Sequence, residues 1–89
     1  MRWQISEGLG WRELDDEIVV RSESTGATHL LESLAAELLH TLVRAGTPLA
    51  AEELAGRLAE EGDALGELSK SIEATLSELH RLGLVEPSG

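Results

Sequence analysis

The spacing of the apolar residues changes abruptly near residue 33, and this change constrains the fold more than any other feature of the chain. Before residue 33, short apolar runs alternate with polar turns, whereas after it leucines recur every three or four residues as far as residue 82. A spacing of two is typical of strands and a spacing of about 3.6 is typical of helices. The sequence therefore predicts an α+β fold, in which a small antiparallel sheet of two to four short strands precedes three helices.

Three helices are expected, each followed by a glycine. The first covers residues 33–45 and the second about residues 50–61, with Gly46 and Gly62 as stops. The third has the clearest pattern, because its apolar residues fall within an arc of about 80° on a helical wheel. They are Leu65, Leu68, Ile72, Leu76 and Leu79, and Gly83 ends the helix.

The N-terminal third predicts a hairpin and a further strand. Residues around Trp11 and the β-branched run 18–21 flank the acidic turn 14–17, which indicates a hairpin. A polar turn ending at Gly26 then leads to another strand at residues 27–31, and residues 3–5 are a candidate fourth strand.

We expect one winged-helix-like domain over residues 1–89, with its core at about residues 11–86. The order of strands followed by three helices, with a short turn between the first two helices, has helix-turn-helix character. Residues 84–86 are expected to form a short extended tail, and residues 87–89 are expected to fray.

The net charge of the chain limits the kinds of molecule that it can be expected to bind. Seventeen acidic residues against seven basic ones give a formal net charge of −10, which repels a phosphate backbone, so nucleic acid is not an expected partner. The chain has no cysteine, and no segment approaches the ~20 apolar residues that span a bilayer. We therefore expect a cytoplasmic protein without a membrane partner.

Residues suited to catalysis or metal binding are few. The three histidines, His29, His40 and His80, do not have the spacing of a helical zinc pair, and no cysteine completes a site. Packing or surface roles are favoured for all three, with contact to a partner as the alternative for His80 and a functional role as the alternative for His29. The acidic turn 15–17 lacks the glycine and the distal glutamate of a calcium loop, so a solvated turn is favoured. We expect no enzyme activity, no cofactor and no metal.

A small sheet beside a helix leaves a strand edge to which an extended peptide can add, while the neighbouring helix contacts alternate side chains. The candidate edge is either residues 18–21 or residues 27–31. The margin of the third helix offers Ser69, Glu73 and His80, which lie about 60–100° from the centre of its apolar stripe.

Five segments of the chain together carry a family resemblance: residues 18–20, 28–31, 34–39, 52–55 and 72–85. Over about residues 11–86 they resemble the PqqD-like family, in which members act as peptide chaperones or recognition elements for ribosomally made, modified peptides (RiPPs). Residues 26–31 are similar to the variety of PqqD-like protein that accompanies an HPr-kinase-related protein in bacterial gene clusters.

This resemblance implies a winged-helix-like domain that binds the leader of a precursor peptide along its third strand and third helix and presents it to a modifying enzyme. It would make Ala27, Thr28, His29 and Leu30 the pairing strand, with Glu73, Ser77 and His80 as contacts on the helix side.

Two other functions remain open on the sequence. A winged-helix regulator would place the third helix in DNA, although its exposed face offers only Lys70 and Arg81 against Glu67 and Glu78. A structural module is the other alternative. Partial exposure of Leu82, Leu84 and Val85 would favour a homodimer.

Overall fold

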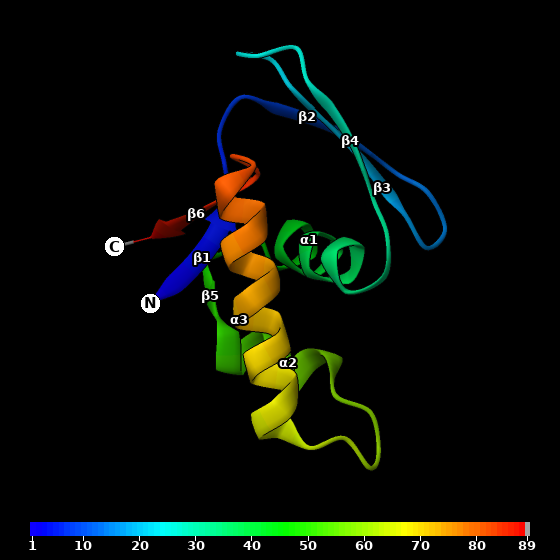
Figure 1. Cartoon of the computed structure of the whole chain (residues 1–89), viewed down its shortest axis with the longest axis vertical. Helices are drawn as coiled ribbons and strands as arrows, with labels where there is room; N and C mark the ends of the chain where they lie inside the picture. The colour runs from blue at the N-terminus through cyan, green and yellow to red at the C-terminus, as the bar shows by residue number, and fades with distance from the viewer. Residues whose placement is uncertain (89) are drawn as a thin grey trace.

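The structure is a computed structural model that describes residues 1–88, and it confirms the predicted α+β class (Figure 1). Two small antiparallel sheets and three helices make up the molecule. The elements in chain order are β1 (Arg2–Ile5), β2 (Leu9–Glu13), β3 (Ile18–Ser22), β4 (Thr28–Leu31), α1 (Ser33–Ala45), β5 (Leu49–Ala50), α2 (Ala51–Leu58), α3 (Leu65–Arg81) and β6 (Val85–Ser88).

The first sheet has the order β2-β3-β4 and contains the predicted hairpin. The backbone N–H of Leu14 donates to the carbonyl of Glu17 at 2.9 Å and closes the acidic turn between β2 and β3. Gly26 has a φ of 75°, in the left-handed region that favours glycine, and it forms the turn before β4. Since β3 lies between two other strands, the alternative that residues 18–21 form an open edge is wrong.

The second sheet has the order β5-β1-β6 and joins the two ends of the chain. Trp3 of β1 pairs with Pro87, and Arg2 pairs with Ser88. The prediction that residues 87 and 88 fray is therefore wrong, while residue 89 lies outside the described residues. The sequence lacks any local sign of this pairing because its partners are more than eighty residues apart, and Pro87 is tolerated because β6 is an edge strand.

The helices agree with prediction except at one end. α2 ends at Leu58, three residues earlier than expected, because Ala59 adopts an extended conformation and Asp63 accepts a hydrogen bond from the backbone N–H of Glu60 at 2.7 Å. Gly83, with a φ of 80°, ends α3 as predicted. No helix within residues 1–88 is both long enough and apolar enough to cross a lipid bilayer.

The core lies where the three helices meet the two sheets. Its fully buried large side chains come from both sheets and from all three helices: Ile18, Val20, Leu38, Leu39, Leu49, Leu54, Ile72, Leu76, Leu79, Leu84 and Val85. Leu82 is half-buried, as expected. The expectation that Leu84 and Val85 are also partly exposed is wrong, because both belong to the core at 0% and 1% exposure. The argument for a homodimer therefore keeps only Leu82.

Alanine substitution of one buried and one exposed leucine of α3 should show which face of this helix contributes to stability. Leu76 is completely buried, so Leu76→Ala should lower the free energy of unfolding by about 2–5 kcal/mol. Leu65 is 55% exposed, and Leu65→Ala should change that free energy by less than about 0.5 kcal/mol. Denaturant unfolding of both variants measures the two values, and equal losses would contradict this assignment of the core.

Candidate functional site

The outer side of β4 is an open strand edge. Within residues 1–88 this strand pairs with β3 alone. The N–H of Ser22 donates to the carbonyl of Ala27 at 2.9 Å, so these two opposite residues form a hydrogen-bonded pair. Between antiparallel strands, hydrogen-bonded and non-hydrogen-bonded pairs alternate, and this one bond therefore shows which residues of β4 are bonded to β3. His29 and Leu31 therefore direct their backbone groups towards β3. Thr28 and Leu30 direct theirs outward, away from β3.

The side chains of β4 divide between its two faces. Leu31 is buried and His29 is half-buried, so one face packs towards the core. Thr28 and Leu30 lie on the other face, and Leu30 is 55% exposed. An exposed leucine therefore lies directly beside the outward-pointing backbone groups.

His80 of α3 is turned towards the terminal sheet. Its ring meets the ring of Trp3 edge-on, with centroids 5.7 Å apart, and its Nδ1 lies 3.1 Å from the carbonyl oxygen of Val85. Since a carbonyl oxygen only accepts, Nδ1 is the donor. His80 therefore connects the end of α3 to β1 and β6.

Glu73 and Ser77 lie on the same flank of α3 as His80. They line a small pocket together with Met1 and Trp3 of the N-terminal segment and Ala51 and Glu52 of α2. The structure thus places all three predicted helix-side residues towards β1 and α2, and it does not bring them together with residues 27–30. The sequence defines how far a residue lies from the apolar stripe, but it does not distinguish the two flanks of the stripe.

The opposite flank of α3 carries Ser71, Thr75, Glu78 and Leu82, because successive helix residues are rotated by about 100°. Figure 1 shows β1 and β6 on one side of α3 and β3 and β4 on the other. The flank opposite His80 therefore turns towards the sheet that carries the open edge of β4.

A second group of interacting side chains connects β2 to α1. The Nδ1 of His40 forms a hydrogen bond with the Oε1 of Glu13, and the Nη2 of Arg44 lies 3.8 Å from the same oxygen. This bond from His40 holds the pKa of Glu13 below its ordinary value, against a partial desolvation that would raise it. No local pattern in the sequence indicates this pair, because its members are 27 positions apart.

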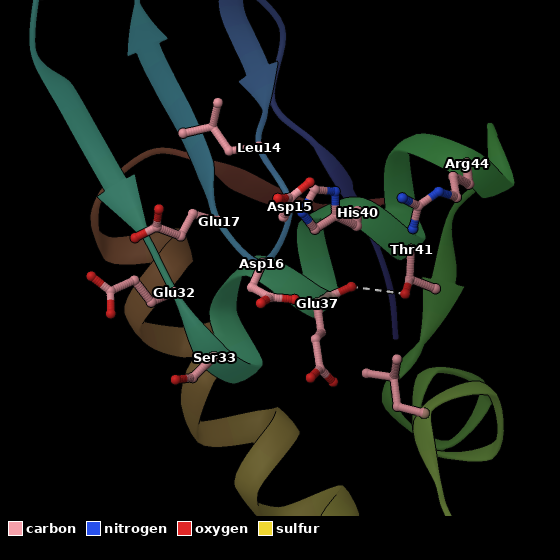
Figure 2. Close-up of a pocket in the computed structure, with 11 residues that line it drawn as sticks. Leu14, Asp15, Asp16, Glu17, Glu32, Ser33, Glu37, His40, Thr41 and Arg44 are labelled. Atoms are coloured by element: carbon pink, nitrogen blue, oxygen red, sulfur yellow. Dashed lines mark hydrogen bonds between the residues drawn. The ribbon is translucent and has the colours of Figure 1, made fainter.

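An acidic pocket of about 750 Å³ lies beside His40 (Figure 2). We call acidic pocket the hollow lined by the β2–β3 turn, by Glu32, by one face of α1 from Ser33 to Arg44, and by Leu58 at the end of α2. The predicted solvated turn forms one wall of it, and Figure 2 shows Asp15 and Asp16 of this turn opposite His40 and Glu37 of α1. In the part of the chain that the structure describes, no three His, Asp or Glu residues are placed to share a metal ion.

Two solved structures have the same fold as this chain, whereas no protein-family model and no curated protein matches its sequence. One is described as TbiB1 in complex with the TbiA(beta) leader peptide, with a TM-score of 0.81 and 21% identity over 97% of this chain and 98% of that chain. The other is lasso peptide synthetase B1 complexed with the leader peptide, with a TM-score of 0.74 and 17% identity over 96% of this chain and 98% of that chain. At these identities the likeness establishes the fold.

Removing the carboxylate of Glu13 should change how the stability of the domain depends on pH. A carboxyl whose pKa is lowered by folding stabilises the folded state above its unfolded pKa, here near 4.5, and this stabilisation is lost as the pH falls through the lower folded value. Glu13→Gln should therefore unfold more easily at pH 7 and lose less stability than the parent chain between about pH 5 and pH 3.

Denaturant unfolding at several pH values measures this difference. Glu61→Gln is the control, because Glu61 is an exposed residue of the loop after α2. An acid-induced loss of stability that is the same in Glu13→Gln and in the parent chain would contradict the role given to the His40 hydrogen bond.

Proposed function

We propose that this chain, acting as one domain over residues 1–89, is a non-catalytic peptide-binding domain. It captures the leader of a ribosomally made precursor peptide by strand addition along β4 and presents it to a modifying enzyme. The observation that carries this proposal is the open edge of β4, in a fold shared with two proteins whose structures are described as leader-peptide complexes.

The backbone of β4 supplies the affinity in this proposal. A leader strand would pair with the outward N–H and C=O groups of Thr28 and Leu30, and each main-chain hydrogen bond contributes about 0.5–1.5 kcal/mol. Side chains of an extended peptide alternate between two faces, so every second leader residue would lie on the face of the exposed Leu30. Ala27 and His29 belong to the same site and set the register of β4 against β3.

The helix side of the site is proposed on the flank of α3 that turns towards β4, with Ser71, Thr75 and Leu82 as contacts. Thr75 and Leu82 are each half-buried on this flank. Glu73, Ser77 and His80, which the family resemblance implied, are instead given a supporting role, because their neighbours are β1, β6 and α2.

The RiPP part of the resemblance draws support from the two leader-peptide complexes. The narrower similarity to the variety that accompanies an HPr-kinase-related protein rests on residues 26–31 alone and stays a prediction. The same is true of the modifying enzyme as a partner.

DNA binding draws little support by comparison. Arg81, one of two basic residues expected on the exposed face of α3, is hydrogen-bonded through its Nε to Glu78 at 3.0 Å. With a formal net charge of −10, the remaining surface repels a phosphate backbone.

Binding can be tested by titrating the isotopically labelled chain with candidate leader peptides, the TbiA leader among them. Amide signals of residues 27–31 and of α3 should shift in a saturable manner. If neither region is perturbed by any leader, the proposed function is wrong.

Proline at position 30 should block this addition without unfolding the sheet. The N–H of Leu30 points outward, so Leu30→Pro removes no bond to β3 but removes a donor to the peptide, and leader binding should weaken at least about tenfold. Leu30→Ala keeps the donor and should weaken binding less than Leu30→Pro does.

Trp11→Pro is the matched control for this experiment, because Trp11 directs its N–H outward at the opposite edge of the same sheet. It should leave leader affinity within about twofold of the parent value. A loss confined to Trp11→Pro would move the site from β4 to β2.

A further inference from the structure

We propose that Arg21 of β3 selects peptides that carry one acidic residue beside β4, two positions from an apolar residue. This inference rests on the proposed strand addition, and it names the class of peptide that the edge of β4 would accept. The observation that carries it is an exposed arginine without an ion-pair partner within residues 1–88, separated from the open edge only by Thr28.

The sheet β2-β3-β4 has one face that points away from the core, and we call it the outer face. Ile18 and Val20 are buried on the inner face, so the residues that alternate with them in β3 and their cross-strand partners lie on the outer face. These outer-face residues are Gly10, Arg12, Val19, Arg21, Thr28 and Leu30. They include two arginines and no carboxylate, so the strands present positive charge here although the chain as a whole is strongly acidic.

Arg21 is not engaged by an acid of its own chain. Within residues 1–88, neither Arg12 nor Arg21 takes part in an ion pair, and both are exposed. Glu23 follows Arg21 by two positions and is exposed as well, but no ion pair joins the two in this part of the chain. The guanidinium group of Arg21 is therefore available to a carboxylate from outside.

Arg21 lies close enough to the edge of β4 to reach an added peptide. It is directly opposite Thr28, and neighbouring strands lie about 4.8 Å apart, so a peptide residue opposite Thr28 would be about 10 Å from Arg21. An arginine and a glutamate that extend towards each other across the sheet span this distance. Thr28 is short and exposed, so its side chain leaves room for the two charged groups to meet above it.

The position beside Leu30 has a different character. Leu30 is 55% exposed and lies opposite the half-buried Val19, so a peptide residue there adds to an apolar row. Arg12 lies beyond Val19 in the same row, three strand spacings or about 14 Å from the peptide, which is too far for an ion pair. The outer face thus favours an acidic residue opposite Thr28 and an apolar residue opposite Leu30, two positions apart in the peptide.

One acidic residue is expected in the peptide, and a strongly acidic peptide is not. The chain has a formal net charge of −10, which repels any partner with a large negative charge. The attraction by Arg21 is local, because it acts through one close pair of groups. The preferred peptide therefore carries its acid at the position opposite Thr28 and little negative charge elsewhere.

Selection from a library of displayed random ten-residue peptides tests this specificity. The full chain, Arg21→Glu and Arg12→Glu serve as baits at low salt, and the two variants have the same net charge. Peptides retained by the parent chain and by Arg12→Glu should be enriched in an acidic residue two positions from an apolar one. Those retained by Arg21→Glu should carry lysine or arginine in place of the acid, because the charge that they face is reversed.

Two results of the selection would overturn the proposal. If Arg21→Glu still retains peptides with the acid, another group of the chain recognises it. If Arg12→Glu loses the preference as completely as Arg21→Glu does, the preference follows the overall charge of the chain and not the position of Arg21.

Affinities of one retained peptide measure the contribution of the pair. Replacing its acid with the corresponding amide should weaken binding to the parent chain about two- to fivefold, the range of an exposed ion pair. The same replacement should change binding to Arg21→Gln by less than about 1.5-fold, and high salt should remove the difference. Equal losses for the parent chain and Arg21→Gln would refute a direct pair.

Failure of this inference can be distinguished from failure of the proposed function. A retained peptide should shift the amide signals of residues 27–31 in the isotopically labelled chain. If such shifts occur and all three baits share one acid preference or have none, the role of Arg21 is refuted while strand addition stands. If no retained peptide shifts these signals, strand addition is refuted, and the role of Arg21 with it.

Discussion

Burial of one face of α3 fixes the orientation of every other surface of the molecule. Ile72, Leu76 and Leu79 are at most 2% exposed, so the helix cannot rotate about its axis without exposing apolar area to water. Because the helix is fixed, His80 must face Trp3, and the opposite flank must turn towards the sheet of β4. The position of the proposed contacts on α3 is thus a consequence of packing in the core.

Features that depend on neighbouring residues could be predicted from the sequence, and features that depend on distant ones could not. The change of period at residue 33 and the β-branched run at residues 18–21 are local signals, and they predicted the fold class, the hairpin and the strand that became β4. The pairing of β1 with β6 and the hydrogen bond between Glu13 and His40 join segments that share no local pattern. For α3, the apolar stripe predicted the buried face correctly, but the choice between its flanks was made by Trp3 and by the strands on either side.

The placement of the ion pairs explains why negative charge accumulates at the acidic pocket. Arg2 pairs with Glu53, Arg81 with Glu78, and Arg44 approaches Glu13, so these basic residues are engaged at other acids. Exposed pairs of this kind contribute little to stability. A chain with ten more acidic than basic residues cannot neutralise every carboxylate, and the acids around His40 are among those left over.

An open edge with an exposed leucine is a risk for any protein, because identical chains can add to one another there. Here the risk is limited in two ways: β4 has only four residues, and two copies that each carry a net charge of −10 repel one another as they approach. A leader peptide with little negative charge does not meet this repulsion. The same charge that discourages self-association, and with it a homodimer built on β4, therefore does not oppose the strand addition proposed above.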